Sequence, residues 1–105
     1  MRTLIIILSI LISILISTAV HANDHNTSYS NISELKSWDD RVDIYFKNGQ
    51  EHVCSGGHKA RYLLDSSKNN HLTFLLSAFM SGKSVQLAYS CINGGYPWVD
   101  GVRLK

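Results

Sequence analysis

The stretch Arg41-Val-Asp-Ile-Tyr-Phe-Lys-Asn-Gly49 decides the fold of this chain. Val42, Ile44 and Phe46 alternate with polar or amphipathic residues, and this period of two is typical of a strand with one buried face. The Asn-Gly pair that ends the stretch favours a tight turn, because both residues accept a positive φ. We therefore predict a hairpin that has residues 50–55 as its second arm.

Downstream of this hairpin, the sequence predicts a helix between further short strands. Apolar residues in the range 72–80 follow the spacing of one helix face, residues 65–67 offer side-chain caps, and Gly82 suits a left-handed helix terminus. The helix face that we expect in the core consists of Leu72, Leu75, Leu76, Phe79 and Met80. Short strands are expected at residues 61–64, 85–90 and 98–104.

The resulting order is strand, strand, strand, helix, strand, strand, which indicates a mainly β domain of the α+β class. A single helix is too little for a parallel βαβ architecture, so we expect a small antiparallel barrel or curled sheet with the helix packed across it, and an OB-like barrel fits this order. Residues 23–31 are polar and lack large aliphatic side chains, and we expect them to form a flexible leader. The single domain is therefore expected to cover residues 32–105.

The N-terminal segment predicts export from the cell. Met1-Arg-Thr3 gives a short positive start, residues 4–20 form an almost unbroken apolar run, and Ala19-Val-His-Ala22 places small residues where a signal peptidase cuts. We expect residues 1–22 to be a signal peptide, and the protein to be secreted or periplasmic with no membrane span after cleavage. The alternative is an uncleaved anchor, because the apolar run approaches the length of a membrane span.

Both cysteines, Cys54 and Cys91, lie beyond the expected cleavage site. An exported chain with two cysteines most simply joins them in a disulfide, since the compartment is oxidising. The closed loop between them would stabilise the domain by at most roughly 4 kcal/mol. A free catalytic thiol or a metal ligand is the competing interpretation.

Charge and residue pattern argue against several function classes. Of the ten Lys and Arg residues, only Arg2 precedes the expected cleavage site, and the other nine are scattered among eight Asp and Glu residues. A chain without a basic stripe is not expected to bind nucleic acid. We also find no nucleophile with a recognisable base, and so expect neither an enzyme nor a cofactor.

Histidines near the first cysteine form a weak metal-binding pattern. His52, Cys54 and His58 could approach one another, but a disulfide would consume the thiolate and no fourth ligand is evident. We expect no metal site. An enzyme or metal protein that uses His52, His58 or His71 stays open as a minor hypothesis.

The segment Asn93-Gly-Gly-Tyr-Pro-Trp-Val-Asp100 contains the candidate ligand-binding residues. Aromatic rings next to amide and carboxylate groups suit sugars, because the C–H faces of a sugar pack on rings while its hydroxyls need hydrogen-bond partners. The residues that we expect to contact a ligand are Asn93, Tyr96, Trp98 and Asp100. Alternatively, one of the two aromatic rings closes an end of the barrel.

A family resemblance rests on two motifs, Phe79-Met-Ser-Gly-Lys-Ser-Val-Gln-Leu87 and, after Cys91, Tyr96-Pro-Trp-Val99. The chain between about Val42 and Leu104 resembles the B subunits of subtilase cytotoxin and its pertussis-like relatives. It is also similar to small exported bacterial proteins of that general pattern. The resemblance implies an OB fold, a pentameric ring and binding of cell-surface glycans.

We therefore expect an exported, non-enzymatic binding module that resembles the B subunit of an AB5 toxin and recognises a glycan. The alternative is a periplasmic interaction or inhibitor protein that uses an exposed sheet edge or the aromatic loop against a protein partner.

Overall fold

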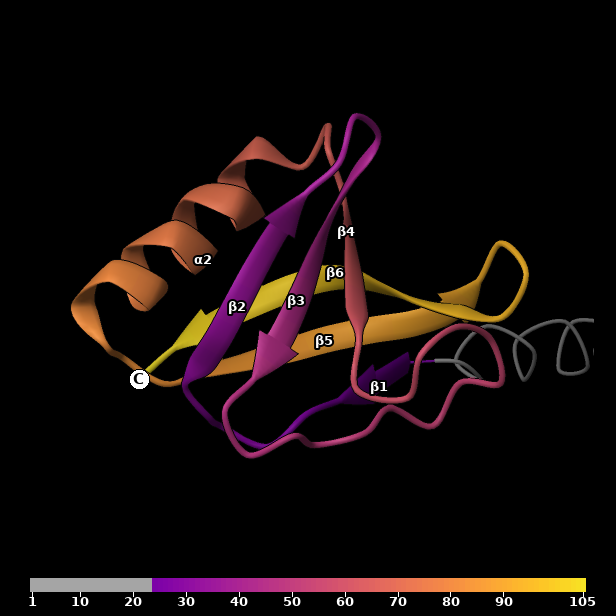
Figure 1. Ribbon diagram of the computed structural model, residues 1–105, viewed down its shortest axis with the longest axis horizontal. Coiled ribbons are helices and arrows are strands. Elements are labelled where there is room, and N and C mark those ends of the chain that lie inside the picture. The colour runs from indigo at the N-terminus through magenta and orange to yellow at the C-terminus, as the bar shows by residue number, and fades with distance from the viewer. Residues whose placement is uncertain (1–23) are drawn as a thin grey trace, which may run out of the picture.

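A computed structural model describes residues 24–105 as one mixed sheet of six strands with one helix (Figure 1). The strands are β1 (Asp24–Asn26), β2 (Ile32–Ser37), β3 (Arg41–Phe46), β4 (Tyr62–Asp65), β5 (Val85–Ile92) and β6 (Tyr96–Leu104), and the helix is α2 (Asn69–Ser81). The mainly β, α+β class is confirmed. The expected signal peptide and its cleavage site lie outside the described residues. Within residues 24–105, no helix has the length and apolar character needed to cross a membrane.

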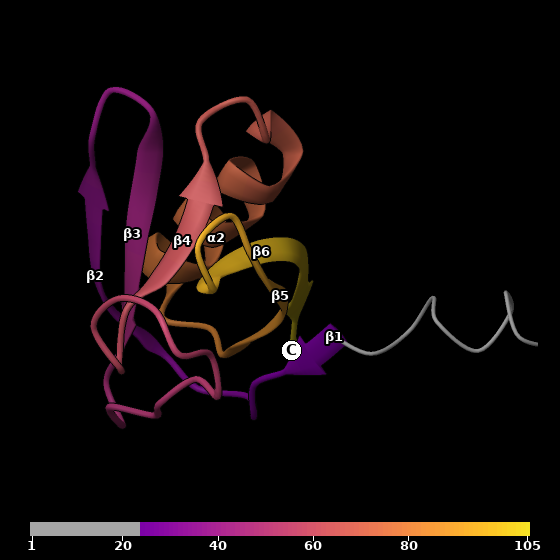
Figure 2. The ribbon, with the colours of Figure 1, turned by 90° about the vertical axis from the view of Figure 1, so that its right-hand side faces the viewer.

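The prediction of a closed antiparallel barrel is wrong in two respects. The strand order is β1-β5-β6-β4-β3-β2, so β1 and β2 are separate edges and the sheet stays open. The pair β4–β6 is parallel, because residues 66–95 form a connection long enough to bring the chain back in the same direction. Figure 2 shows β2 and β1 on opposite sides of the sheet.

Residues 24–31 are part of the folded domain and differ from the flexible leader that their composition predicts. Strand β1 pairs antiparallel with β5, and Ser30 forms a further bridge with Val85. Thr27 is buried, and its hydroxyl accepts a hydrogen bond of 2.9 Å from the N–H of Leu87. Backbone pairing supplies this order, and it does not require the large apolar side chains that the sequence lacks here.

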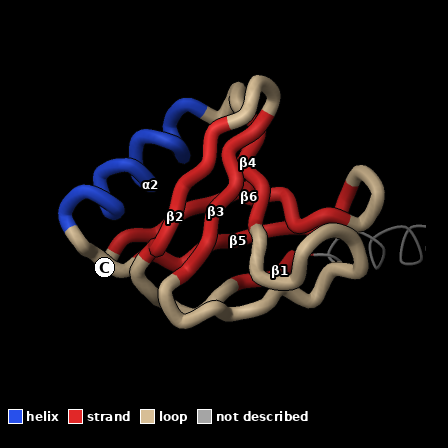
Figure 3. The backbone as a smooth tube through the Cα atoms, in the orientation of Figure 1, coloured by secondary structure: helices blue, strands red, loops and turns tan. Residues whose placement is uncertain are grey.

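The hairpin expected after Asn48-Gly49 does not form. Gly49 has a φ of +65° and donates its N–H to the carbonyl of Phe46, so the chain does turn there. However, residues 50–61 form a long loop, shown in tan in Figure 3. The hairpin of β3 is made with β2 instead, and β4 occupies the other side of β3. Both sides of β3 are therefore occupied, and residues 50–55 have no free side of β3 to pair with.

Helix α2 ends as predicted, although only part of its apolar face is buried. Gly82 adopts the left-handed conformation with a φ of 70°, whereas no side chain of residues 65–67 caps the first turn. Leu75 and Ala78 are fully buried, and Leu72 is partly buried. Leu76, Phe79 and Met80 are 44%, 43% and 85% exposed, so the prediction that they are core residues is wrong. The helix packs on one end of a narrow sheet (Figure 1), and the sheet therefore covers only a narrow stripe of the helix surface.

The disulfide between Cys54 and Cys91 is confirmed, with a Cα–Cα distance of 5.4 Å. It joins the loop of residues 50–61 to the end of β5. The core lies between the sheet, α2 and this loop. Its buried residues are Ile32, Val42, Ile44, Phe46, Cys54, Tyr62, Leu64, Leu75, Ala78, Val85, Leu87, Tyr89 and Val99.

Candidate functional site

The sheet has an inner face that carries the core and an outer face that carries mostly polar and aromatic side chains. In the register, Asp43 of β3 lies beside Leu63 of β4, Leu63 beside Trp98 of β6, and Trp98 beside Ser90 of β5. Residues opposite one another in neighbouring strands share a face. These four residues therefore form one row across the outer face.

The predicted ligand contacts on β6 share this outer face. Tyr96, Trp98 and Asp100 alternate with the buried Pro97 and Val99, so the three side chains point away from the core. Asn93 lies in the turn just before β6, where it is exposed and has a positive φ of 50°. The structure thus brings all four predicted residues to one face of the sheet.

Two open hollows flank the Trp98 side chain. One, of about 250 Å³, includes Asp65, Lys68 and Asp100 in its wall. The other, of about 260 Å³, includes Arg41, Arg61 and Tyr96. Asn93 and Trp98 line both hollows, so Trp98 stands between two compartments that each carry charged groups in their walls.

Asp43 is the charged residue that the sequence analysis missed. Asp43 is only 1% exposed. Its carboxylate accepts hydrogen bonds from Trp38 Nε1 at 2.8 Å and from Arg41 Nε at 3.0 Å. Lys36 Nζ lies 4.4 Å from the centre of the Trp38 ring. Arg41 and Asp43 are two positions apart on a strand and so share a face, which is the sequence signal that could have found this pair.

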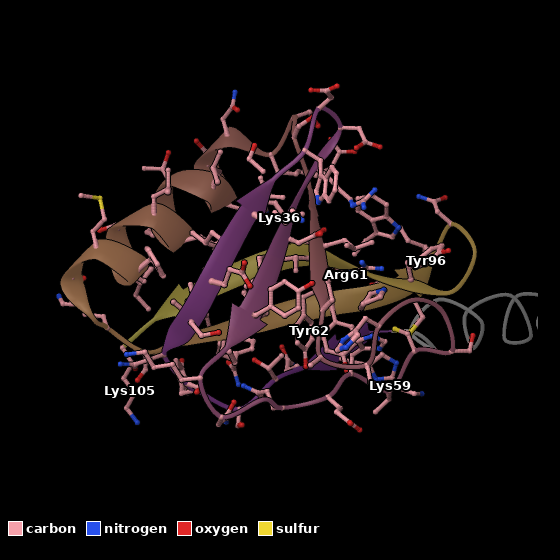
Figure 4. All side chains as sticks on the ribbon, in the orientation of Figure 1. Lys36, Lys59, Arg61, Tyr62, Tyr96 and Lys105 are labelled. Carbon is pink, nitrogen blue, oxygen red and sulfur yellow. A yellow bond between two sulfur atoms is a disulfide. The ribbon has the colours of Figure 1, made fainter. Side chains whose placement is uncertain are left out.

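Close contact between two glycine loops supports the Tyr96 ring. A Cβ atom on Gly57 would lie 2.9 Å from Cδ1 of Tyr96, and one on Gly56 would lie 2.8 Å from the carbonyl oxygen of Gly94. Gly56 also donates its N–H to the carbonyl of Gly95. The adjacent glycines Gly56 and Gly57 allow this approach because neither carries a side chain. Figure 4 labels Tyr96 near the turn between β5 and β6 and Arg61 on the side of β4, and both line the second hollow.

One polar atom of Trp98 has no partner. The side chain is partly exposed, yet Nε1 is buried and makes no hydrogen bond within the described residues. Leaving a buried donor unpaired costs about 1–3 kcal/mol, so such groups usually have a reason to persist. Nearby, Ser90 Oγ donates to Asp100 Oδ2 at 2.9 Å and orients that carboxylate.

Asp65, at the rim of the first hollow, is held by the next turn. Its Oδ1 accepts hydrogen bonds from the N–H and the hydroxyl of Ser67, at 2.9 and 2.7 Å. These bonds favour the ionised form and lower the pKa of Asp65 below its usual value. The hollow therefore keeps a negative charge on this side.

His52 has a structural role. Its Nδ1 accepts from the N–H of Cys54 at 3.1 Å, which leaves Nε2 to donate to the carbonyl of His58 at 2.8 Å. Both ring nitrogens are engaged, and the Cys54 sulfur belongs to the disulfide. In residues 24–105, no three His, Cys, Asp or Glu side chains form a group that could hold a metal ion.

No protein-family model, curated protein or solved structure matches this chain. The resemblance to toxin B subunits therefore stays a prediction from short motifs. The function has to be inferred from the geometry of the outer face.

Proposed function

We propose that the protein is a secreted or periplasmic, non-enzymatic binding module that holds a carbohydrate on the outer face of its sheet, against Trp98. The observation that carries this proposal is the position of Trp98 between two hollows that both have charged groups in their walls. A sugar can pack a C–H face on an indole ring while its hydroxyls reach polar groups on either side.

The groups around Trp98 supply both kinds of hydrogen-bond partner. Asp65 and Asp100 offer acceptors on one side, while Arg41 and Arg61 offer donors on the other. Asn93 reaches both hollows and has an amide that can donate and accept. Because both hollows are small and open, a single site is expected to bind weakly, and affinity would rise with several linked sites.

The strand connectivity supports the OB-like part of the proposal in an open form. Strands β2, β3 and β4 form a meander, the helix follows, and β6 returns between β4 and β5. The toxin B-subunit resemblance implies this type of arrangement. The pentameric ring that it also implies stays a prediction.

A glycan array tests the proposal directly. The oxidised protein, purified as the cell exports it, is compared with Trp98→Ala and with Phe74→Ala, a matched aromatic control on the exposed side of α2. We expect selective glycan binding that Trp98→Ala abolishes and Phe74→Ala preserves, with both variants folded by circular dichroism. Absence of binding on a multivalent array, or binding that survives Trp98→Ala, would contradict the proposal.

A protein partner at the same face is the second candidate. Trp, Tyr and Arg are the residues most enriched in the energetic centres of protein interfaces, and the outer face presents Trp98, Tyr96 and Arg61 together. An interaction or inhibitor protein would therefore use the same side chains. Capture of one defined protein from the exported fraction, lost with Trp98→Ala, would favour this function over glycan binding.

A further inference from the structure

Strand β2 leaves one of its sides unpaired within residues 24–105, since its only neighbour in the sheet is β3. The N–H of Trp38 donates to the carbonyl of Arg41, and this fixes the alternation of the ladder. Because every second residue of an antiparallel strand bonds to the same neighbour, the N–H and C=O groups of Lys36 and Glu34 also point toward β3. The N–H and C=O groups of Leu35 and Ser37 consequently point to the free side.

The side chains of β2 alternate in the same way between the two faces of the sheet. Glu34 and Lys36 are exposed, and Lys36 stands over the outer face above Trp38. Leu35 lies on the inner face, where it packs against the core. With Ser37, Val42, Leu72 and Leu76 it lines an apolar groove of about 260 Å³ between β2 and α2.

We propose that β2 pairs antiparallel with β2 of a second copy of this chain, about a two-fold axis at Leu35. In this register Leu35 faces Leu35 of the second copy, and the two residues exchange both of their outward N–H···O bonds. Glu34 then lies opposite Lys36 of the other copy, and Lys36 lies opposite Glu34. Both opposite-charge pairs are favourable as direct cross-strand neighbours.

The two neighbouring registers that also use the outward backbone groups are unfavourable. Moving the axis to Glu34 places the two Glu34 side chains opposite each other, and moving it to Lys36 does the same for the two lysines. Like charges directly opposite each other destabilise a strand pair. Charged residues on an edge strand commonly prevent pairing with unrelated strands. Here the positions of Glu34 and Lys36 favour pairing with β2 of a second copy.

The inner face of the same edge offers apolar surface to the second copy. Leu72, Leu76 and Met80 are four residues apart and form one row on α2, with Phe79 beside it. A two-fold axis perpendicular to the sheet places both helices on the same face of the joined sheet. The exposed Leu76 side chain, which lines the groove together with Leu35, would then lose water contact next to the paired Leu35 residues.

The same symmetry relates this dimer to the outer face. A perpendicular two-fold axis turns both outer faces, and therefore both Trp98 side chains, to the same side of the dimer. If the proposed function holds, the dimer would present two glycan sites to one surface, although the dimer itself does not depend on that function. Two-fold pairing closes with two copies, so this dimer is an alternative to the pentameric ring that the family resemblance implies.

Charge reversal tests the dimer by sedimentation equilibrium on the oxidised protein as the cell exports it. We expect the unchanged protein to dimerise. Glu34→Lys and Lys36→Glu should each raise the dimer dissociation constant about tenfold or more, because each turns both cross-strand pairs into like-charge pairs. The double variant Glu34→Lys/Lys36→Glu should restore the dimer. Lys59→Glu, a charge reversal on the exposed loop, is the control and should change nothing (Figure 4).

Mixing the two single variants gives the decisive result. One then carries two lysines and the other two glutamates on β2, so an equimolar mixture should form a heterodimer at concentrations where each variant alone is mostly monomeric. A variant that had merely unfolded could not be rescued in this way. A monomer at all concentrations, an assembly of more than two copies, or a mixture without heterodimer would overturn the proposal.

Discussion

The inner face of the sheet buries apolar side chains under α2, whereas the outer face buries a carboxylate, Asp43, beneath Trp38 and Arg41. The same strands supply both faces, because side chains alternate along each strand. On the inner face, stability follows from removing apolar area from water. On the outer face, burial depends on each polar group finding a partner, so that a small number of residues carry the geometry of the site.

Truncating the inner face should have the largest effect. Leu75→Ala removes a fully buried side chain of α2 and should lower the free energy of unfolding by about 2–5 kcal/mol, since it leaves a cavity. Urea denaturation measures the change. Phe74→Ala is the matched control, because Phe74 lies on the exposed side of the same helix and is 51% exposed, so its loss should cost much less. An unchanged midpoint for Leu75→Ala would mean that the helix does not pack as described.

Removing the buried charge of the outer face should cost less. Asp43→Ala leaves the indole N–H of Trp38 and the guanidinium of Arg41 without their shared acceptor, and should lower the free energy of unfolding by about 1–3 kcal/mol. Arg41 keeps some contact with water, which limits the loss. The control is Asp40→Ala, because Asp40 is exposed and lies 3.9 Å from Arg41. Equal effects of the two substitutions in urea would refute this account of Asp43.

Alkaline pH should destabilise the protein through Tyr62, which is buried in the core on the inner face. Burial, followed by the negative potential of Tyr89 and Glu51, raises the pKa of Tyr62 well above its usual value of 10.0. The folded state therefore holds this proton after the unfolded chain has released it. Stability from this group is complete below about pH 10 and should fall above it by up to about 1.4 kcal/mol per pH unit. Tyr62→Phe should flatten the pH dependence, which urea titrations between pH 9 and 11 would reveal.

The smallest effect is expected at Asp65, on the exposed rim of the outer face. Its pKa lies below the usual value because Ser67 donates two hydrogen bonds to the carboxylate. Its contribution to stability is therefore present above the unfolded-state pKa of about 4 and disappears as the pH falls through the lower folded-state pKa. Asp65→Asn should slightly reduce the acid dependence of the unfolding midpoint. An unchanged acid limb would show that the turn is held without this charge.

Several elements could be predicted because their signals are local. The apolar alternation of β3 and β5, the helix that ends at Gly82, and the disulfide all follow from spacing or from the chemistry of two residues. The alternation of β6 also predicts that Tyr96, Trp98 and Asp100 share a face. For this reason, the candidate site was found from one continuous segment.

Other features could not be predicted because they depend on distant parts of the chain. Residues 24–26 form a strand only because β5 offers a free edge, and Asn48-Gly49 starts no hairpin because β2 and β4 already flank β3. The contributions of Arg41 and Arg61 to the site were missed for the same reason. They reach Trp98 across strand pairs that the sequence does not specify.

By itself, the sequence determined that β3, β5 and β6 extend, that one segment coils, that the two cysteines join, and which residues of β6 share a face. These properties arise from the fixed periods of strands and helices and from the oxidation of paired thiols. Only the tertiary structure decided that the sheet stays open, that β4 and β6 run parallel, and that Asp43 is buried while Leu76, Phe79 and Met80 are exposed. The physical reason is that backbone groups can pair with any free edge, and a side chain is buried only when residues far away in sequence cover it.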